Sequence, residues 1–299
     1  MENPPIQFPS DSTREVTGEP RAKAAPDPDD PPWGLPGAVG LLILSFLLMI
    51  FISLGFLVPY ALRRGVGLAA LPQFALTDPR AILVQLLSIF PAHLLTLGLA
   101  WLLVTRGGKY PFFRTLGWEW GAGFTPWRCA GLALLLYAVG FGILSLSGEC
   151  DNELERIIRS SRGAAIAAAA AASLTAPLVE EILFRGLLYS ALRRLVGVSW
   201  AVAVVLIIFA LIHVPQYSPC YGVIGTILLL SAVLTVVRAR TRNLLPCFFI
   251  HLVFNSVQAV LIVLAPYLQR FIPPETPPVP APSPGLVAEL FLRLFGTAW

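Results

Sequence analysis

Residues 176–186 place two adjacent carboxylates and an arginine inside an otherwise apolar run. The sequence on both sides of Glu180, Glu181 and Arg185 is rich in Ala, Leu and Val and long enough to cross a bilayer. An ionised side chain at the centre of a membrane costs about 2.5–3.5 kcal/mol on insertion scales, so such groups persist where they are paired and used. This stretch is therefore the first candidate for a functional site.

The composition indicates a polytopic membrane protein. Hydrophobic residues make up 56% of the 299-residue chain and charged residues 13%, whereas soluble domains have about 45–50% and about 25%. The net charge is only +4, and the basic residues stand in short clusters between apolar runs. This distribution is typical of membrane topology signals, so we expect the lipid bilayer as a partner and no nucleic acid.

The apolar segments predict an all-α, polytopic transmembrane helical bundle with about seven to eight spans and a kinked, motif-bearing helix. The predicted spans cover residues 40–62, 80–104, 129–146, 164–192, 199–214, 222–237 and 244–268. Pro177 is expected to kink the fourth span one turn before Glu180, because proline lacks the N–H and clashes with the preceding turn. The charged connector 149–162 is expected to form an interfacial helix.

The chain divides into three parts by composition. Residues 1–36 are predicted to form a disordered N-terminal tail, because Pro, Asp, Ser and Glu dominate them. Residues 37–270 are predicted to form the transmembrane helical domain, whose core at about 164–264 holds the polar motifs. Residues 271–299 are predicted to be a Pro-rich linker and a short amphipathic C-terminal segment in the membrane interface.

The basic loops predict an orientation. With seven spans, the tail and the loops after the second, fourth and sixth spans share one side and hold most of the Lys and Arg. The positive-inside rule then places the N-terminus in the cytoplasm. The same orientation puts His213 towards the far side of the membrane.

The four cysteines show no CxxC pairing: Cys129, Cys150, Cys220 and Cys247. Three of them lie in or beside apolar runs. They are interpreted as small core residues, and the sequence suggests neither a disulfide framework nor a thiolate metal site.

Polar residues recur at helical spacing on three different spans. Glu181 and Arg185 are four residues apart and can pair on one helix face, whereas Glu180 is rotated away by about 100° and is free to face a cavity. Phe209 and His213 share a face in the same way, as do the residues of a third pair, His251 and Asn255. A carboxylate, two imidazoles and an amide that converge inside a bundle can activate water and hold an oxyanion.

Each of these elements also has a simpler interpretation. A lone histidine in a membrane span is often a helix–helix hydrogen-bonding residue, and this is the interpretation favoured for His93. The pair of Glu181 and Arg185 can be structural, and an asparagine in a span is commonly an interhelical clasp. The three motifs together, in this order, favour a functional site.

The motifs Glu180-Glu181-Ile-Leu-Phe184-Arg185, Phe209-Ala-Leu-Ile-His213 and His251-Leu-Val-Phe-Asn255 resemble the signatures of the CPBP intramembrane proteases. That family includes the type II CAAX prenyl endopeptidases and relatives linked to bacteriocin processing or immunity. The resemblance covers about residues 164–264. It implies a protease core there and a cavity that opens to the cytoplasm.

The resemblance also implies roles for the matching residues. Glu180 would be the general base that activates water, and His213 would hold or polarise that water. His251 and Asn255 would stabilise the tetrahedral oxyanion. The supporting residues would be Glu181, Arg185 and Phe209.

The resemblance leaves the mechanism open between a glutamate protease and a metalloprotease. Glu180, His213 and His251 are enough ligands for a catalytic zinc with an open fourth position. No HExxH motif is present, and the use of His251 as an oxyanion donor removes a ligand. A mechanism that requires no cofactor is preferred, with zinc as the alternative.

The predicted function is an intramembrane endopeptidase that hydrolyses a peptide bond of a membrane-associated or lipid-linked protein or peptide. The alternatives are a non-catalytic membrane immunity or regulatory protein of the same fold, and a small-solute transporter, for which no inverted repeat is visible. The Ala-, Leu- and Pro-rich sequence looks bacterial, which favours the bacterial cytoplasmic (inner) membrane. Protein prenylation is eukaryotic, so a CAAX substrate is not assumed.

Overall fold

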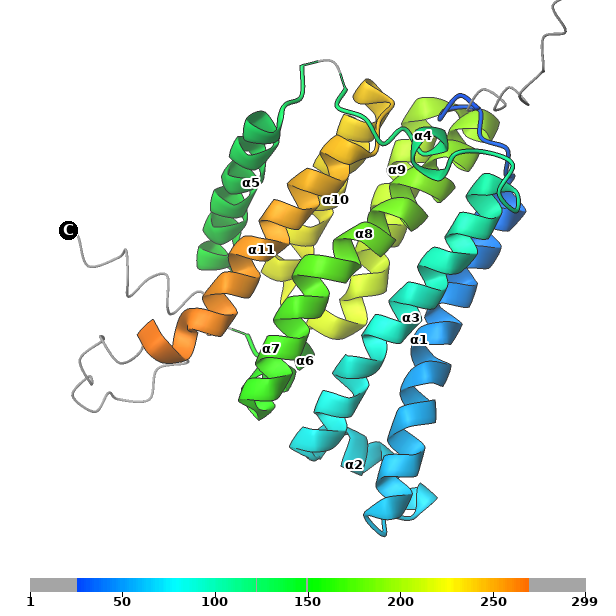
Figure 1. The fold of residues 1–299 in the computed structure, drawn as a ribbon. Coiled ribbons are helices and arrows are strands. Elements are labelled where there is room, and N and C mark those ends of the chain that lie inside the picture. Colours follow the sequence, from blue (N-terminus) through cyan, green and yellow to red (C-terminus); the bar gives the residue numbers. More distant parts are fainter. Residues whose placement is uncertain (1–25, 122, 149, 269–299) are drawn as a thin grey trace, which may run out of the picture.

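A computed structural model describes residues 26–121, 123–148 and 150–268. These residues form helices and connecting loops, with no strand among them. The predicted all-α bundle is therefore confirmed (Figure 1). The predicted linker and C-terminal segment at 271–299 lie outside the described residues.

Long apolar helices form the bundle: α1 (Leu35–Arg63), α3 (Pro79–Thr105), α5 (Pro126–Ser147), α10 (Tyr221–Thr241) and α11 (Leu245–Leu268). A continuous helical run between α5 and α10 comprises α7 (Arg162–Ala170), η2 (Ala171–Thr175), α8 (Ala176–Glu180), η3 (Glu181–Leu188) and α9 (Tyr189–Tyr217), of which η2 and η3 are π-helical. Short helices connect the long ones: η1 (Leu68–Ala70), α2 (Leu71–Thr77), α4 (Phe112–Thr115) and α6 (Glu153–Ser160). The predicted interfacial helix at 149–162 corresponds to α6.

Six helical segments of the described residues are long and apolar enough to cross a membrane, and the longest, Arg162–Tyr217, has 56 residues. It is not one span, because Gly197 adopts φ 80° and ψ 175° and breaks the helix. Only glycine takes this conformation without steric cost. The two halves fold back on each other, since the rings of Phe184 and Phe209 meet at 5.1 Å across the break. This hairpin corresponds to the fourth and fifth predicted spans, so the described residues form seven apolar segments, against a predicted count of about seven to eight.

Large apolar side chains cover the outside of the bundle as well as its core. Phe51, Leu94, Leu135 and Trp200 are all more than half exposed. A soluble monomer rarely exposes contiguous apolar surface on this scale, whereas lipid-facing helices require it. The chain is an integral, multi-pass membrane protein.

The four segments that the sequence assigns to one side of the membrane do lie together. Asp29 of the N-terminal segment contacts Arg193 beside the Gly197 break, and it also contacts Arg238 and Arg242 at the end of α10. The loop between α3 and α5 joins them, because the backbone N–H of Leu244 donates to the carbonyl of Gly117 at 2.7 Å. We call this end of the bundle the basic end; it is the upper end in Figure 1.

Residues 26–34, which the sequence analysis assigns to the N-terminal tail, pack against the bundle. Trp33 is buried, and its indole N–H donates to the carbonyl oxygen of Leu187 at 3.2 Å. Arg194 holds the same segment through the carbonyl oxygens of Pro31 and Trp33. Composition does not predict this packing, because it depends on contacts such as those of Asp29 with Arg193 and Arg238, which are distant in sequence. Residues 1–25 lie outside the described residues.

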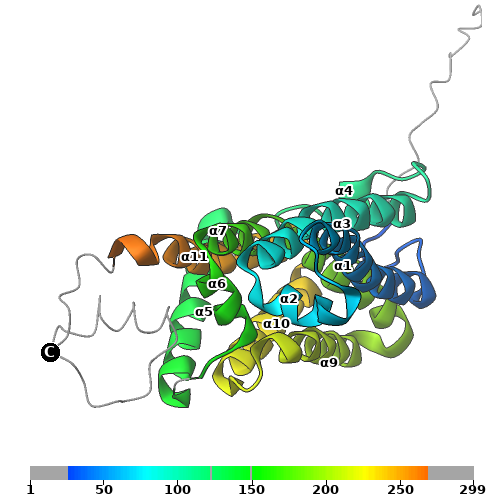
Figure 2. The same cartoon turned by 90° about the horizontal axis from the view of Figure 1, so that it is seen from below.

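The prediction that the cysteines form no disulfide is wrong. Cys150 and Cys220 form a disulfide that links the loop before α6 to the start of α10. They are 70 residues apart in sequence, so no short sequence motif indicates that they pair. Cys129 and Cys247 are free and buried, as predicted for small core residues. The disulfide lies at the end of the bundle opposite the basic end, which we call the disulfide end and which Figure 2 views from below.

The disulfide predicts a simple thiol count. Denatured protein should react with two equivalents of maleimide before reduction and with four after it, because the chain has four cysteines. Replacing Cys150→Ser should lower the unfolding temperature in detergent, since a disulfide contributes about 2–4 kcal/mol. Gel-shift alkylation and thermal unfolding check the two statements. Four reactive thiols in protein that was never exposed to reductant would contradict the pairing.

Asp29 predicts a pH-dependent contribution to stability. Burial acts to raise the pKa of its carboxyl, but hydrogen bonds from Arg193 and Arg242 and the charge of Arg238 hold that pKa below the ordinary value. A carboxylate of this kind stabilises the fold above its unfolded pKa of about 3.9 and loses the contribution at lower pH. Asp29→Asn should therefore destabilise the protein by about 3 kcal/mol at neutral pH. The difference from the native chain should shrink as the pH falls below about 3.9 and through the lowered pKa of Asp29, as thermal unfolding across pH would measure; a constant difference would contradict it.

Candidate active site

Pro177 disturbs the helix just before the paired glutamates, as the sequence predicts, and the disturbance takes the form of a wide π-helical turn. The π-helix η2 ends at Thr175, two residues before the proline. In i to i+5 hydrogen bonding, the missing N–H of residue 177 would have served the carbonyl of Ala172. The side chain of Asn255 replaces it, because its Nδ2 donates to that carbonyl oxygen at 2.9 Å. The hydrogen bond that compensates for Pro177 thus connects α11 to the motif-bearing helix.

Glu181 and Arg185 form a fully buried ion pair. Nη1 of Arg185 donates to Oε1 of Glu181 at 2.9 Å, and both side chains have no exposed surface. The remaining guanidinium donors reach α10, with Nη2 at 2.8 Å from Oγ of Ser231 and Nε at 3.2 Å from Oγ1 of Thr235. A buried charge is tolerated when its hydrogen-bonding capacity is used in this way. The predicted pairing of the two residues is present.

His251 connects this ion pair to the neighbouring glutamate. Its Nδ1 lies 2.9 Å from Oε1 of Glu181, and its Nε2 lies 3.7 Å from Oε2 of Glu180. The Glu181 oxygen that pairs with Arg185 accepts a hydrogen bond from His251, so Nδ1 carries the proton. Glu181 therefore fixes the ring so that Nε2 faces Glu180.

Phe209 packs between the charged and the imidazole groups. Its ring lies 4.4 Å from the Arg185 guanidinium, 4.7 Å from the His213 ring and 6.1 Å from the His251 ring. The face of an aromatic ring attracts a cation, so this contact also holds the arginine. The sequence predicts Phe209 near the cavity, and the structure places it there.

His213 has its ring orientation set by its own helix. Nδ1 is 2.6 Å from the backbone carbonyl oxygen of Phe209, one turn earlier. A carbonyl oxygen can only accept, so Nδ1 is the protonated nitrogen. In the neutral imidazole, Nε2 is then a hydrogen-bond acceptor, and His213 lines the cavity.

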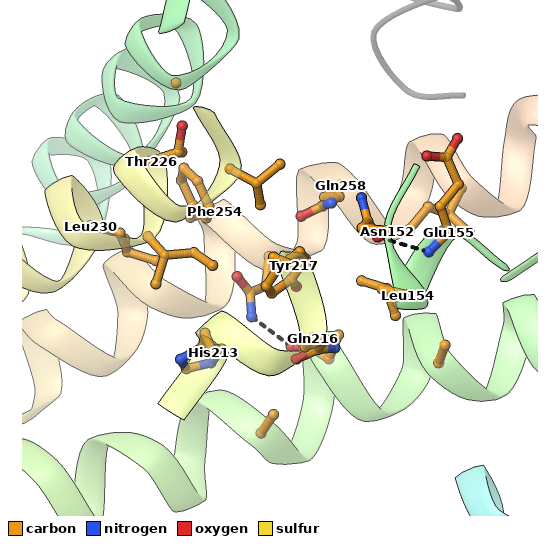
Figure 3. Close-up of a pocket in the computed structure, with 18 of the residues that line it drawn as sticks. Asn152, Leu154, Glu155, His213, Gln216, Tyr217, Thr226, Leu230, Phe254 and Gln258 are labelled. Carbon is orange, nitrogen blue, oxygen red and sulfur yellow. Dashed lines mark hydrogen bonds between the residues drawn. The ribbon is translucent and has the colours of Figure 1, made fainter. Parts of the chain in front are cut away.

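A cavity of about 560 Å³ brings the predicted catalytic residues together. Glu180, His213, His251 and Asn255 all line it, although they come from three separate helical segments. Figure 3 shows His213 in this pocket, with Tyr217 between it and the region of Asn152 and Glu155. Glu181 and Arg185 lie behind the cavity wall and do not line it.

His93 fits the simpler interpretation given above. Its Nδ1 lies 2.8 Å from Oγ1 of Thr175 on η2, which is an interhelical hydrogen bond. The hydroxyl of Thr175 donates to the carbonyl oxygen of Ala171, so it accepts from the imidazole. His93 also forms part of the cavity wall.

The alternative metal set does not converge. Among the described residues no group of three His, Cys, Asp or Glu side chains is placed to hold a metal ion. Glu180, His213 and His251 share the cavity without forming such a group. The zinc alternative, a metalloprotease, is not supported.

Sequence analysis missed the residues that complete the site from other elements. Ser231 and Thr235 bind Arg185, and their spacing of four residues on an otherwise apolar span is the signal that marks them. Tyr217 stacks on His213 with ring centroids 6.4 Å apart. It stands four residues after His213, so the helical spacing that paired Phe209 with His213 extends to it.

Residues 162–257 match the family model described as type II CAAX prenyl endopeptidase Rce1-like. The match confirms the resemblance to the CPBP family over these residues, which contain all three motifs. This segment is therefore similar to the intramembrane CAAX-type proteases. Comparisons with curated proteins and with solved structures found no match.

The buried ion pair predicts a stability effect that double substitution separates from chemistry. Arg185→Met should destabilise the protein by about 3–5 kcal/mol, because it leaves the Glu181 carboxylate buried and unpaired. Adding Glu181→Leu should recover much of that loss, since two apolar residues need no partners. Thermal unfolding in detergent measures both effects. If the double variant were no more stable than Arg185→Met, the cost would not arise from the orphaned charge.

Proposed function

We propose that this protein is an intramembrane endopeptidase in which Glu180 activates the water that attacks a peptide bond. The observation that carries the proposal is the difference in surroundings between the two adjacent carboxylates. Glu181 is bound by Arg185 and His251 and has no exposed surface. Glu180 faces the cavity with its side chain about a quarter exposed (24%), so it can exchange protons with water and substrate.

The attacking water is held between Glu180 and His213. Nε2 of neutral His213 accepts a hydrogen bond, because the proton on Nδ1 is committed to Phe209. A water that donates one hydrogen to Glu180 and the other to His213 presents its lone pair to a carbonyl carbon. Glu180 takes the proton as the bond forms and returns it to the leaving amine, which is general acid–base catalysis with one carboxyl group.

Asn255 and His251 stabilise the oxyanion. Nδ2 of Asn255 has two hydrogens, and the carbonyl of Ala172 uses one of them, so the second is available to the substrate oxygen. Nδ1–H of His251 is hydrogen-bonded to Glu181, and Nε2 would donate to the oxyanion when it also carries a proton. Removing one such donor typically costs about 10²–10³ in rate.

No step of this mechanism is routed through a metal or other cofactor. The donor atoms of the zinc set do not form a ligand group in the described part of the chain. The base is Glu180, the water is held with the help of His213, and Asn255 provides a hydrogen-bond donor.

The substrate is a peptide or protein at the membrane. Apolar side chains such as Leu86, Ile89 and Leu144 share the cavity wall with the amides of Gln216 and Gln258, a lining that suits an extended segment with apolar side chains. The cellular location we propose is the bacterial cytoplasmic (inner) membrane.

Glu180→Gln tests the proposal. The variant keeps the shape of the side chain and removes the base, so cleavage should fall by about 10²–10⁴-fold while thermal unfolding stays unchanged. The matched control is Glu153→Gln, which removes a carboxylate on α6 that only pairs with Arg156. A screen of membrane-anchored peptides with purified protein in detergent, read by mass spectrometry, provides the measurement.

The screen separates the alternatives. Full activity in Glu180→Gln would overturn the assignment of the base. Absence of cleavage by the native chain across the screen would favour the non-catalytic immunity or regulatory protein. Run with and without a chelator, the native chain should cleave at the same rate, and loss of activity on chelation would instead support the zinc alternative.

A further inference from the structure

The two ends of the bundle differ in basic charge. Nine Lys and Arg residues of the described ranges belong to the basic end: Arg106, Lys109, Arg114, Arg128, Arg193, Arg194, Arg238, Arg240 and Arg242. Six belong to the disulfide end: Arg63, Arg64, Arg80, Arg156, Arg159 and Arg162. By the positive-inside rule the basic end faces the cytoplasm.

The cysteines give an independent indication of the same orientation. Cys150 and Cys220 are bonded at the disulfide end. The free thiols of Cys129 and Cys247 lie at the starts of α5 and α11, which are at the basic end. Disulfides persist in oxidising compartments and are rare in the cytoplasm. The disulfide end therefore faces the extracytoplasmic side.

The cavity extends from the candidate catalytic residues towards the disulfide end. Beyond His213 its wall continues along Gln216 and Tyr217 and reaches Cys150 and Asn152. Nδ2 of Asn152 lies 3.7 Å from Sγ of Cys220, so the disulfide lies beside this end of the cavity. Figure 3 shows Asn152 at the end of the pocket remote from His213.

Packed side chains fill the bundle between the catalytic residues and the basic end. Phe184, Leu187 and Tyr189 are almost fully buried in one core cluster with Trp33. Arg238 is buried beyond them and bonds the carbonyl oxygen of Arg185 at 3.2 Å. A cluster of this kind separates the cavity from the cytoplasmic side.

We propose that the active-site cavity opens to the extracytoplasmic side and that the substrate is an exported, membrane-anchored polypeptide. Its cleavable segment enters at the disulfide end and reaches Glu180 along the apolar wall. The cytoplasmic opening implied by the family resemblance does not apply to this chain, because the basic loops and the free thiols lie at its closed end. The substrate assignment rests on the proposed protease function, whereas the side of the opening does not.

Single cysteine substitutions test the side of the opening without any cleavage assay. Arg156→Cys adds an exposed thiol on α6 beside the opening, and Lys109→Cys adds one at the basic end. In intact cells a membrane-impermeant sulfonated maleimide should label Arg156→Cys and should label Lys109→Cys only after lysis. The native chain, whose free cysteines are buried, is the unlabelled control. Labelling of Lys109→Cys alone in intact cells, or of both variants, would overturn the proposal.

Two reporters test the substrate class. Each has one apolar span and the same randomised juxtamembrane library, displayed outside the cell in one reporter and in the cytoplasm in the other. The native chain should cleave only the external display, and Glu180→Gln should cleave neither. Cleavage of the cytoplasmic display alone would overturn the substrate class. If labelling places the opening outside and neither reporter is cleaved, the protease function and the substrate class fail together, while the orientation stands.

Discussion

The buried pair of Glu181 and Arg185 is the interaction on which the rest of the site depends. Two charges without exposed surface are tolerable in a membrane bundle only if each finds further partners. The arginine therefore recruits α10 through Ser231 and Thr235, and the glutamate recruits α11 through His251. One ion pair thus fixes three helices around one point, and the fixed helices define the cavity.

Proline adds a second constraint of the same kind. Pro177 leaves a carbonyl without its helical partner, and a free carbonyl at membrane depth needs a substitute donor. Asn255 supplies that donor and is held four residues from His251 on the same helix. The side chain that satisfies a structural deficit keeps a second N–H for the cavity, so fold stability and the proposed oxyanion site share one residue.

The asymmetry of the bundle gives the site a direction. At one end Asp29 joins three arginines and closes the bundle over a packed core. At the other end the loops are joined by the Cys150–Cys220 disulfide and border the cavity. On the proposed opening, water and substrate would reach the site from the end opposite the basic end.

The sequence by itself determined the helical class and indicated the approximate span positions, because apolar run length and helical spacing are local properties. It also predicted different roles for Glu180 and Glu181, and those roles stay predictions. It also indicated Pro177 as the site of the helix disturbance. Only the tertiary structure decided what pairs across long separations, namely the disulfide, the packing of residues 26–34, and the partners of Arg185 on α10. Those contacts depend on which faces of distant helices meet. The spacing of residues along the chain does not predict which faces these are. The proposed direction of the cavity likewise rests on tertiary contacts, namely the packed core at the basic end and the lining residues near the disulfide.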